Sequence, residues 1–150
     1  MTASTRGSSR PSAAGLLARR LALLALFEEE FRPGSAGSAL ERIATERDVP
    51  DAVRIHASTI VSGVGDHRAD LDARIAREAP LIPVAELGRV ERTILRSAMF
   101  EVLYSAATPS GETMRDAVSL ARIYAGDAAR RLVNGVLGSV SRSPGGGASR

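Results

Sequence analysis

The sequence of 150 residues predicts an all-α fold, with six or seven helices in two small antiparallel bundles. Three observations support this prediction. Apolar residues recur every three or four positions, which is the helical period, and no stretch alternates over the length of a strand. Clusters of proline and glycine divide the chain into pieces of ordinary helix length. Hydrophobic residues make up 44% of the chain and aromatic residues only 3%, which indicates a core of Leu, Ala, Val and Ile.

The stretch 87–105 has the widest apolar arc, as is typical of a helix that several neighbours surround. The apolar positions of this arc are Leu87, Val90, Ile94, Leu95, Ala98, Met99, Val102 and Leu103. Two carboxylates interrupt the pattern, because Glu91 falls in the middle of the arc and Glu101 near its edge. A buried carboxylate without a partner is costly. We therefore expect a partner for each of these two acids.

The first helix is predicted over 15–31, after a disordered basic tail formed by 1–14. Its apolar residues lie on two nearly opposite faces, one with Leu17 and Leu21 and the other with Leu23 and Leu26. Such a helix is either fully buried or keeps one face for a partner. The acidic run 28–30 at its end is expected to be a solvated helix terminus.

The rest of the chain is divided near Pro80, where prolines interrupt the helical period. The other predicted helices are 39–47, 51–75, 112–124 and 127–141. Gly63 and Gly65 are weak points of the second of these, and Gly126 suits a helix C-terminus. This division predicts an N-terminal helical subdomain at 15–79, a C-terminal helical subdomain at 80–141 and a flexible tail at 142–150.

Charge is unevenly distributed, and all 20 basic residues are arginines. Residues 1–27 contain four arginines and no acid, and residues 114–150 contain six arginines and two acids. Between them, residues 28–113 contain ten arginines and fifteen acids. Basic ends around an acidic middle indicate that a polyanion binds at the ends and a different partner in the middle.

Several classes of function find no support in the sequence. There is no cysteine, and the two histidines are about 16 Å apart on a helix, so no metal site is predicted. No nucleophile–base pair or nucleotide-binding loop is present, which favours a binding protein without a cofactor over an enzyme. No apolar run is long enough to span a membrane. We expect a cytoplasmic protein, with an organellar transit peptide as the alternative interpretation of the N-terminus.

Three segments, in this order, resemble the NusB family of transcription antitermination factors. They are LARRLALLALFEEEF, ELGRVERTILRSAMFEVLY, and MRDAVSLARIY followed by RRLVNGVLGSV. Together they cover most of residues 16–140. The resemblance implies a protein of two helical subdomains that binds boxA-type leader RNA of ribosomal RNA transcripts. It also implies pairing with the ribosomal protein that acts as antitermination factor E, in a complex with RNA polymerase.

The resemblance also assigns roles to individual residues. The implied RNA-binding residues are Arg10, Arg19, Arg20, Arg131 and Leu132. The implied partner-binding residues are Leu23, Phe27 and Glu91. Glu101 matches a family acid and is expected to pair with an arginine inside the protein.

Some positions depart from the family pattern. Leu132 stands where the family has a phenylalanine, and the arginine run before the first helix is reduced to Arg6 and Arg10. Arginines supply much of the affinity for RNA, and aromatic rings stack on its bases. The alternative is therefore a helical protein-interaction module that has kept the fold and lost specific RNA binding.

Overall fold

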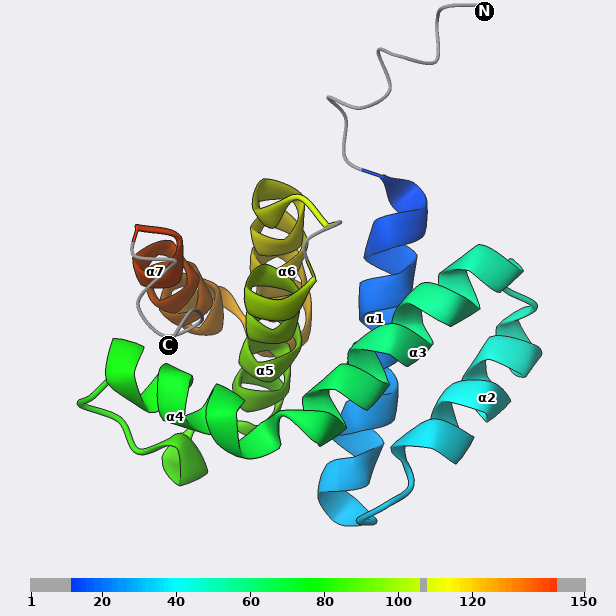
Figure 1. Ribbon diagram of the computed structural model, residues 1–150, viewed down its shortest axis with the longest axis horizontal. Helices are drawn as coiled ribbons and strands as arrows, with labels where there is room; N and C mark the ends of the chain where they lie inside the picture. The colour runs from blue at the N-terminus through cyan, green and yellow to red at the C-terminus, as the bar shows by residue number, and fades with distance from the viewer. Residues whose placement is uncertain (1–11, 106–107, 143–150) are drawn as a thin grey trace, which may run out of the picture.

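The computed structural model describes residues 12–105 and 108–142, and within these residues it contains only helices. The elements are α1 (Ala13–Phe31), α2 (Ala36–Arg47), α3 (Asp51–Asp66), α4 (Arg68–Glu78), the 3-10 helix η2 (Val84–Glu86), α5 (Arg89–Tyr104), α6 (Ser110–Ala125) and α7 (Asp127–Arg142). Figure 1 shows their arrangement. The predicted all-α fold is confirmed.

Helix α5 lies at the centre of the molecule, as the wide apolar arc predicts. It contacts α1, α3, α4, α6 and α7. Helices α1, α2 and α3 lie on one side of it and α7 on the other, and α6 packs along it (Figure 1). Helix α4, which the sequence placed in the N-terminal subdomain, packs on α5 and α7, and one buried apolar cluster extends through both halves. The division into two subdomains near Pro80 stays a prediction.

Both apolar faces of α1 are covered. This helix contacts α2, α3, α5 and α6. Its buried apolar residues are Ala18, Leu21, Ala22, Leu23, Ala25 and Leu26. The sequence left two alternatives for α1, full burial or one face kept for a partner. The structure has the first, because both faces are buried over the middle of the helix.

The single helix predicted over 51–75 is wrong, because the chain forms two helices that meet at His67. The backbone of His67 leaves the helical conformation, with φ −116° and ψ 18°. Helix α3 then packs on α1 and α2, whereas α4 packs on α5 and α7. Both helices bury one apolar face, so the helical period continues through the bend and gives no sign of it.

The connection between α6 and α7 follows the sequence closely. Gly126 ends α6 with φ +96°, a conformation that glycine adopts without strain, and its N–H donates to the carbonyls of Ala121 and Arg122. Across the part of the chain that the structure describes, no helix combines the length and apolar character needed to cross a membrane.

Candidate interaction surfaces

Arg19 lies inside the protein, where it joins α1 to α5 and α6. Its Nε donates to Glu101 Oε1 at 2.8 Å, and its Nη1 donates to Asp116 Oδ2 at 2.7 Å and Glu112 Oε2 at 3.3 Å. Its Nη2 donates to Glu101 Oε2 and to Thr113 Oγ1, both at 3.3 Å. A guanidinium has five N–H donors, and these five bonds use all of them.

The carboxylate of Glu101 receives a further bond from α3, where His56 Nε2 lies 2.8 Å from Glu101 Oε2. Burial raises the pKa of Glu101, but hydrogen bonds from His56 and Arg19 outweigh burial and hold the pKa below its ordinary value. Burial dominates at Asp116, whose pKa is raised despite its bond to Arg19. The expected internal arginine partner of Glu101 is therefore confirmed, and it is Arg19.

This geometry leaves two of the expected site residues buried. Arg19 is only 6% exposed and has no donor left for a phosphate. Leu23, an implied partner contact, is 3% exposed and packs in the core one turn along α1. Both residues hold helices together in this structure and present no surface to RNA or to a partner.

The other implied RNA-binding residues fall in separate places. Arg20 is half-buried on α1, and its Nε is buried without a hydrogen-bond partner. Arg131 lies on α7 with 64% of its side chain exposed, and Leu132 beside it packs against the core. Helices α5 and α6 lie between α1 and α7 (Figure 1), so the structure does not join these positions into one site. Arg10 is outside the described residues.

A basic cluster surrounds Asp127 at the turn between α6 and α7. Arg130 Nε donates to Asp127 Oδ1 at 2.8 Å, and Arg131 Nη1 donates to Asp127 Oδ2. The bond from Arg130 lowers the pKa of Asp127, and the charges of Arg131 and Arg122 act in the same direction. Three arginines against one carboxylate leave this turn positively charged.

Aromatic side chains and the start of α5 form a second exposed region. The rings of Phe27 and Phe31 meet edge to face at 5.3 Å, and Arg89 Cζ lies 4.6 Å from the ring centroid of Phe31. Phe31 remains 57% exposed. Glu91 lies in the first turn of α5, two residues after Arg89.

Glu91 is half-buried and is not sealed inside the apolar core. Its carboxylate folds over Gly88, so closely that a Cβ on Gly88 would lie 2.3 Å from Glu91 Oε1. Gly88 immediately precedes α5, and a negative charge is favourable at a helix N-terminus. The local structure therefore stabilises Glu91 without a buried partner.

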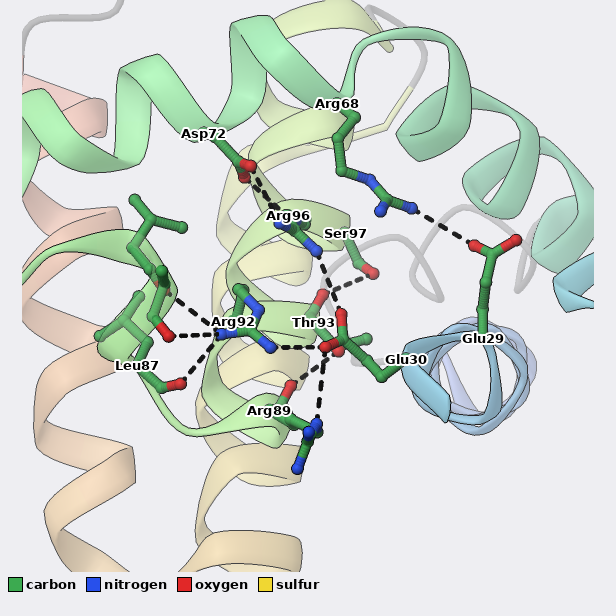
Figure 2. A network of polar contacts seen from close by, with 12 residues as sticks. Glu29, Glu30, Arg68, Asp72, Leu87, Arg89, Arg92, Thr93, Arg96 and Ser97 are labelled. Carbon is green, nitrogen blue, oxygen red and sulfur yellow. Dashed lines mark hydrogen bonds and ion pairs between the residues drawn. The ribbon is translucent and has the colours of Figure 1, made fainter. Parts of the chain in front are cut away.

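The acidic run 28–30 is not a solvated terminus. Glu30 has a side chain only 13% exposed and binds Arg92 and Arg96, with Arg89 Nε 3.8 Å away (Figure 2). Glu29 binds Arg68 Nη2 at 3.3 Å. The prediction of solvated acids was wrong, because arginines far along the chain reach these carboxylates.

The same network continues from Glu30 to α4 and to the linker before α5. Arg96 donates to Asp72 at 2.7 and 2.9 Å, which ties α5 to α4. Arg92 donates to the carbonyls of Val84, Ala85 and Leu87 (Figure 2). A groove of about 840 Å³ runs along these residues. Sequence reasoning missed this network, although arginines spaced three and four apart on α5 were a visible signal.

No group of histidines and acids in the described part of the chain is arranged to hold a metal ion. The fold and these two surfaces define a helical adaptor, a protein whose exposed basic turn and exposed aromatic face suit binding to other molecules.

Comparison with known proteins gives the family. The sequence model of the NusB family matches residues 16–142. The chain is 36% identical over 129 residues to the transcription antitermination protein NusB of Herpetosiphon aurantiacus, covering 84% of this chain and 88% of that one. It is 31% identical over 126 residues to the protein of that name in Dehalococcoides mccartyi, with the same coverage. The chain belongs to the NusB family.

Solved structures show the same fold. A chain from a crystal structure of antitermination factors NusB and NusE in complex with dsRNA matches with a TM-score of 0.78 and 25% identity, over 86% of this chain and 96% of that one. A NusB structure from T. maritima matches with a TM-score of 0.80 and 24% identity, over 89% and 94%. The family resemblance seen in the sequence is confirmed.

Proposed function

We propose that the protein is a transcription antitermination factor that binds boxA-type leader RNA of ribosomal RNA transcripts. It does so together with the ribosomal protein that acts as antitermination factor E, and the pair joins RNA polymerase in the cytoplasm. The observation that carries the proposal is family membership over residues 16–142, together with a fold match to a chain solved with NusE and dsRNA. The role is binding and not catalysis.

The basic turn between α6 and α7 is the RNA-binding surface of this proposal. Arg131 is exposed and Arg130 and Arg122 lie beside it around Asp127. Arginines bind phosphates and make the affinity for RNA depend on salt. The tail before α1 adds Arg6 and Arg10 in sequence.

An exposed ring at the same turn supplies the stacking surface. Tyr124 is 41% exposed in the last turn of α6, two residues after Arg122. Leu132 occupies the position of the family's phenylalanine, so this tyrosine is the ring that a splayed RNA base can reach here.

The aromatic face with the first turn of α5 is the partner surface. Phe31 supplies exposed apolar area beside half-buried Phe27, and Glu91 supplies a carboxylate for a cationic residue of the ribosomal protein. Aromatic residues within a polar rim are typical of protein interfaces.

The RNA-binding proposal is tested by fluorescence anisotropy with a labelled boxA-type RNA over a salt series. Arg131→Ala should weaken binding and reduce the slope of log affinity against log salt by about 1, because one phosphate contact is lost. Arg42→Ala is the matched control, since Arg42 is an exposed arginine of α2 that also pairs with a carboxylate. Equal slopes for wild type and Arg131→Ala would contradict the assignment of this turn.

The partner proposal is tested by calorimetric titration with the ribosomal protein. Glu91→Gln should weaken binding and leave the helical content unchanged, because the charge is lost while the side-chain shape is kept. Glu46→Gln is the control, since Glu46 is an exposed acid on α2. Partner binding without any RNA binding would favour the alternative, an interaction module of the same fold.

A further inference from the structure

We propose that Arg92 is a positioning residue that fixes the linker 79–88 to α1, a connection we call the latch. By fixing the linker, Arg92 holds Leu81 and Ile82 in place as part of the partner surface. The inference rests on the proposed function and extends its partner surface to a segment that the family resemblance did not assign.

The linker displays apolar side chains to solvent. Leu81 is 94% exposed and Ile82 is 39% exposed, between Pro80 and Pro83. Exposed apolar side chains that form a contiguous patch often mark a site where a partner binds. Two prolines also restrict the backbone on either side, which lowers the entropy lost when this segment binds.

Arg92 is the polar connection between this linker and α1. Its Nη1 donates to the carbonyls of Val84 at 3.3 Å, Ala85 at 3.4 Å and Leu87 at 3.1 Å, and its Nη2 donates to Glu30 (Figure 2). The side chain is only 13% exposed. One guanidinium thus satisfies linker carbonyls on one side and a carboxylate of α1 on the other.

The other bonds of the linker backbone are local. The N–H of Ile82 donates to Ala79, that of Glu86 to Pro83 and that of Leu87 to Val84. These bonds shape the linker but do not orient it relative to α1. Leu87 is buried and anchors the C-terminal end, so the polar tie through Arg92 acts on the segment between that anchor and α4.

The latch is continuous with the aromatic face. Glu30 precedes Phe31 directly in sequence, and Arg89, which lies over the Phe31 ring, also approaches Glu30. One carboxylate therefore connects the linker held by Arg92 with the aromatic pair of α1.

Arg96 provides a matched control within the same network. It lies one turn after Arg92 on α5 and also donates to Glu30, at 3.2 Å. Its remaining donors bind Asp72 of α4 and make no bond to the linker carbonyls that Arg92 binds. Replacing Arg96 disturbs the same carboxylate without releasing the linker.

The experiment compares Arg92→Gln and Arg96→Gln in the full chain by calorimetric titration with the ribosomal protein. Hydrogen exchange of residues 80–88 is measured in the absence of the partner. Arg92→Gln should speed exchange in the linker and weaken the partner about tenfold, because charge-assisted bonds to the carbonyls are lost. Arg96→Gln should leave linker exchange unchanged and weaken the partner less.

Two further measurements make the inference specific. Leu81→Ser should weaken the partner in the wild-type background and have a smaller effect in the Arg92→Gln background, as coupled positions do. Affinity for boxA-type RNA without the partner should not change in any of these variants. Additive effects of Leu81→Ser and Arg92→Gln would overturn the inference.

The outcomes separate this inference from the proposed function. If the wild-type protein binds the partner and Arg92→Gln binds equally well, the latch is wrong and the proposed function stands. Equal losses in Arg92→Gln and Arg96→Gln also overturn the latch. If the wild-type protein fails to bind the ribosomal protein, the proposed function fails and this inference fails with it.

Discussion

Arg19 shows how strongly one side chain can depend on its surroundings. In sequence it is an arginine in a basic stretch, and in the structure it lies among Glu101, Glu112 and Asp116. Removing a guanidinium from water is costly, but five hydrogen bonds and three carboxylates compensate for the lost hydration. The arrangement crosslinks three helices through a single residue.

We expect Arg19→Ala to destabilise the protein by about 3–5 kcal/mol, because buried Glu101 and Asp116 lose their cation. Arg19→Lys should recover only part of this loss, since an ammonium has three donors and no planar fork. Urea unfolding followed by circular dichroism measures both changes. Full stability in Arg19→Ala together with weakened RNA binding would contradict the structural role and restore the expected RNA contact.

The acidic run 28–30 shows why the surroundings of a single residue do not follow from the local sequence. Three adjacent acids at a helix end are normally solvated, yet each pairs with a different arginine. Glu28 binds Arg42, and Glu30 binds Arg92 at a separation of 62 residues. No local pattern predicts an ion pair across that distance, because it depends on how the helices are placed.

At the scale of helices, the contact between α3 and α5 depends on a glycine. The ring of Phe100 lies so close to Gly63 that a Cβ there would be 2.1 Å from the ring. The sequence indicated Gly63 as a weak point of a long helix. In the structure it allows two helices to approach closely, while the break falls four residues later at His67.

This packing predicts opposite effects at two glycines of the same helix. Gly63→Ala should destabilise the protein by about 1–3 kcal/mol, because Phe100 must move from a packed position. Gly65→Ala meets nothing within 4 Å and should stabilise α3 by about 0.5–1 kcal/mol. Thermal unfolding of both variants provides the measurement. A stabilising Gly63→Ala would show that Phe100 has room to shift.

At the scale of the whole molecule, the buried ion pairs make stability depend on pH. The pKa of Glu101 is lower in the folded protein than its ordinary value of 4.5, so the folded state binds fewer protons. The stability that Glu101 contributes is complete above about pH 4.5 and is lost as the pH falls through the lowered pKa. Asp116, whose pKa is raised, acts in the opposite direction: its contribution is present below its ordinary value of 3.8 and lost as the pH rises through the raised pKa.

We therefore expect the unfolding free energy of the wild type to fall below about pH 4.5 more steeply than that of Glu101→Gln. Urea unfolding at several values between about pH 6 and pH 3 measures the difference, which isolates Glu101 from the other acids. Parallel profiles for the two proteins would mean that Glu101 does not titrate differently in the folded and unfolded states.

The sequence alone was sufficient for the all-α class, most helix ends, the central place of α5 and the family, because helical period, glycine caps and family motifs are local features. It also indicated that Glu101 needed an arginine. Only the three-dimensional arrangement shows that this arginine is Arg19, that the chain bends at His67 and that Glu30 of the acidic run pairs with arginines of α5. Burial and ion pairing arise between helices distant in sequence, where a residue's type does not reveal whether its neighbour is water, an opposite charge or the core.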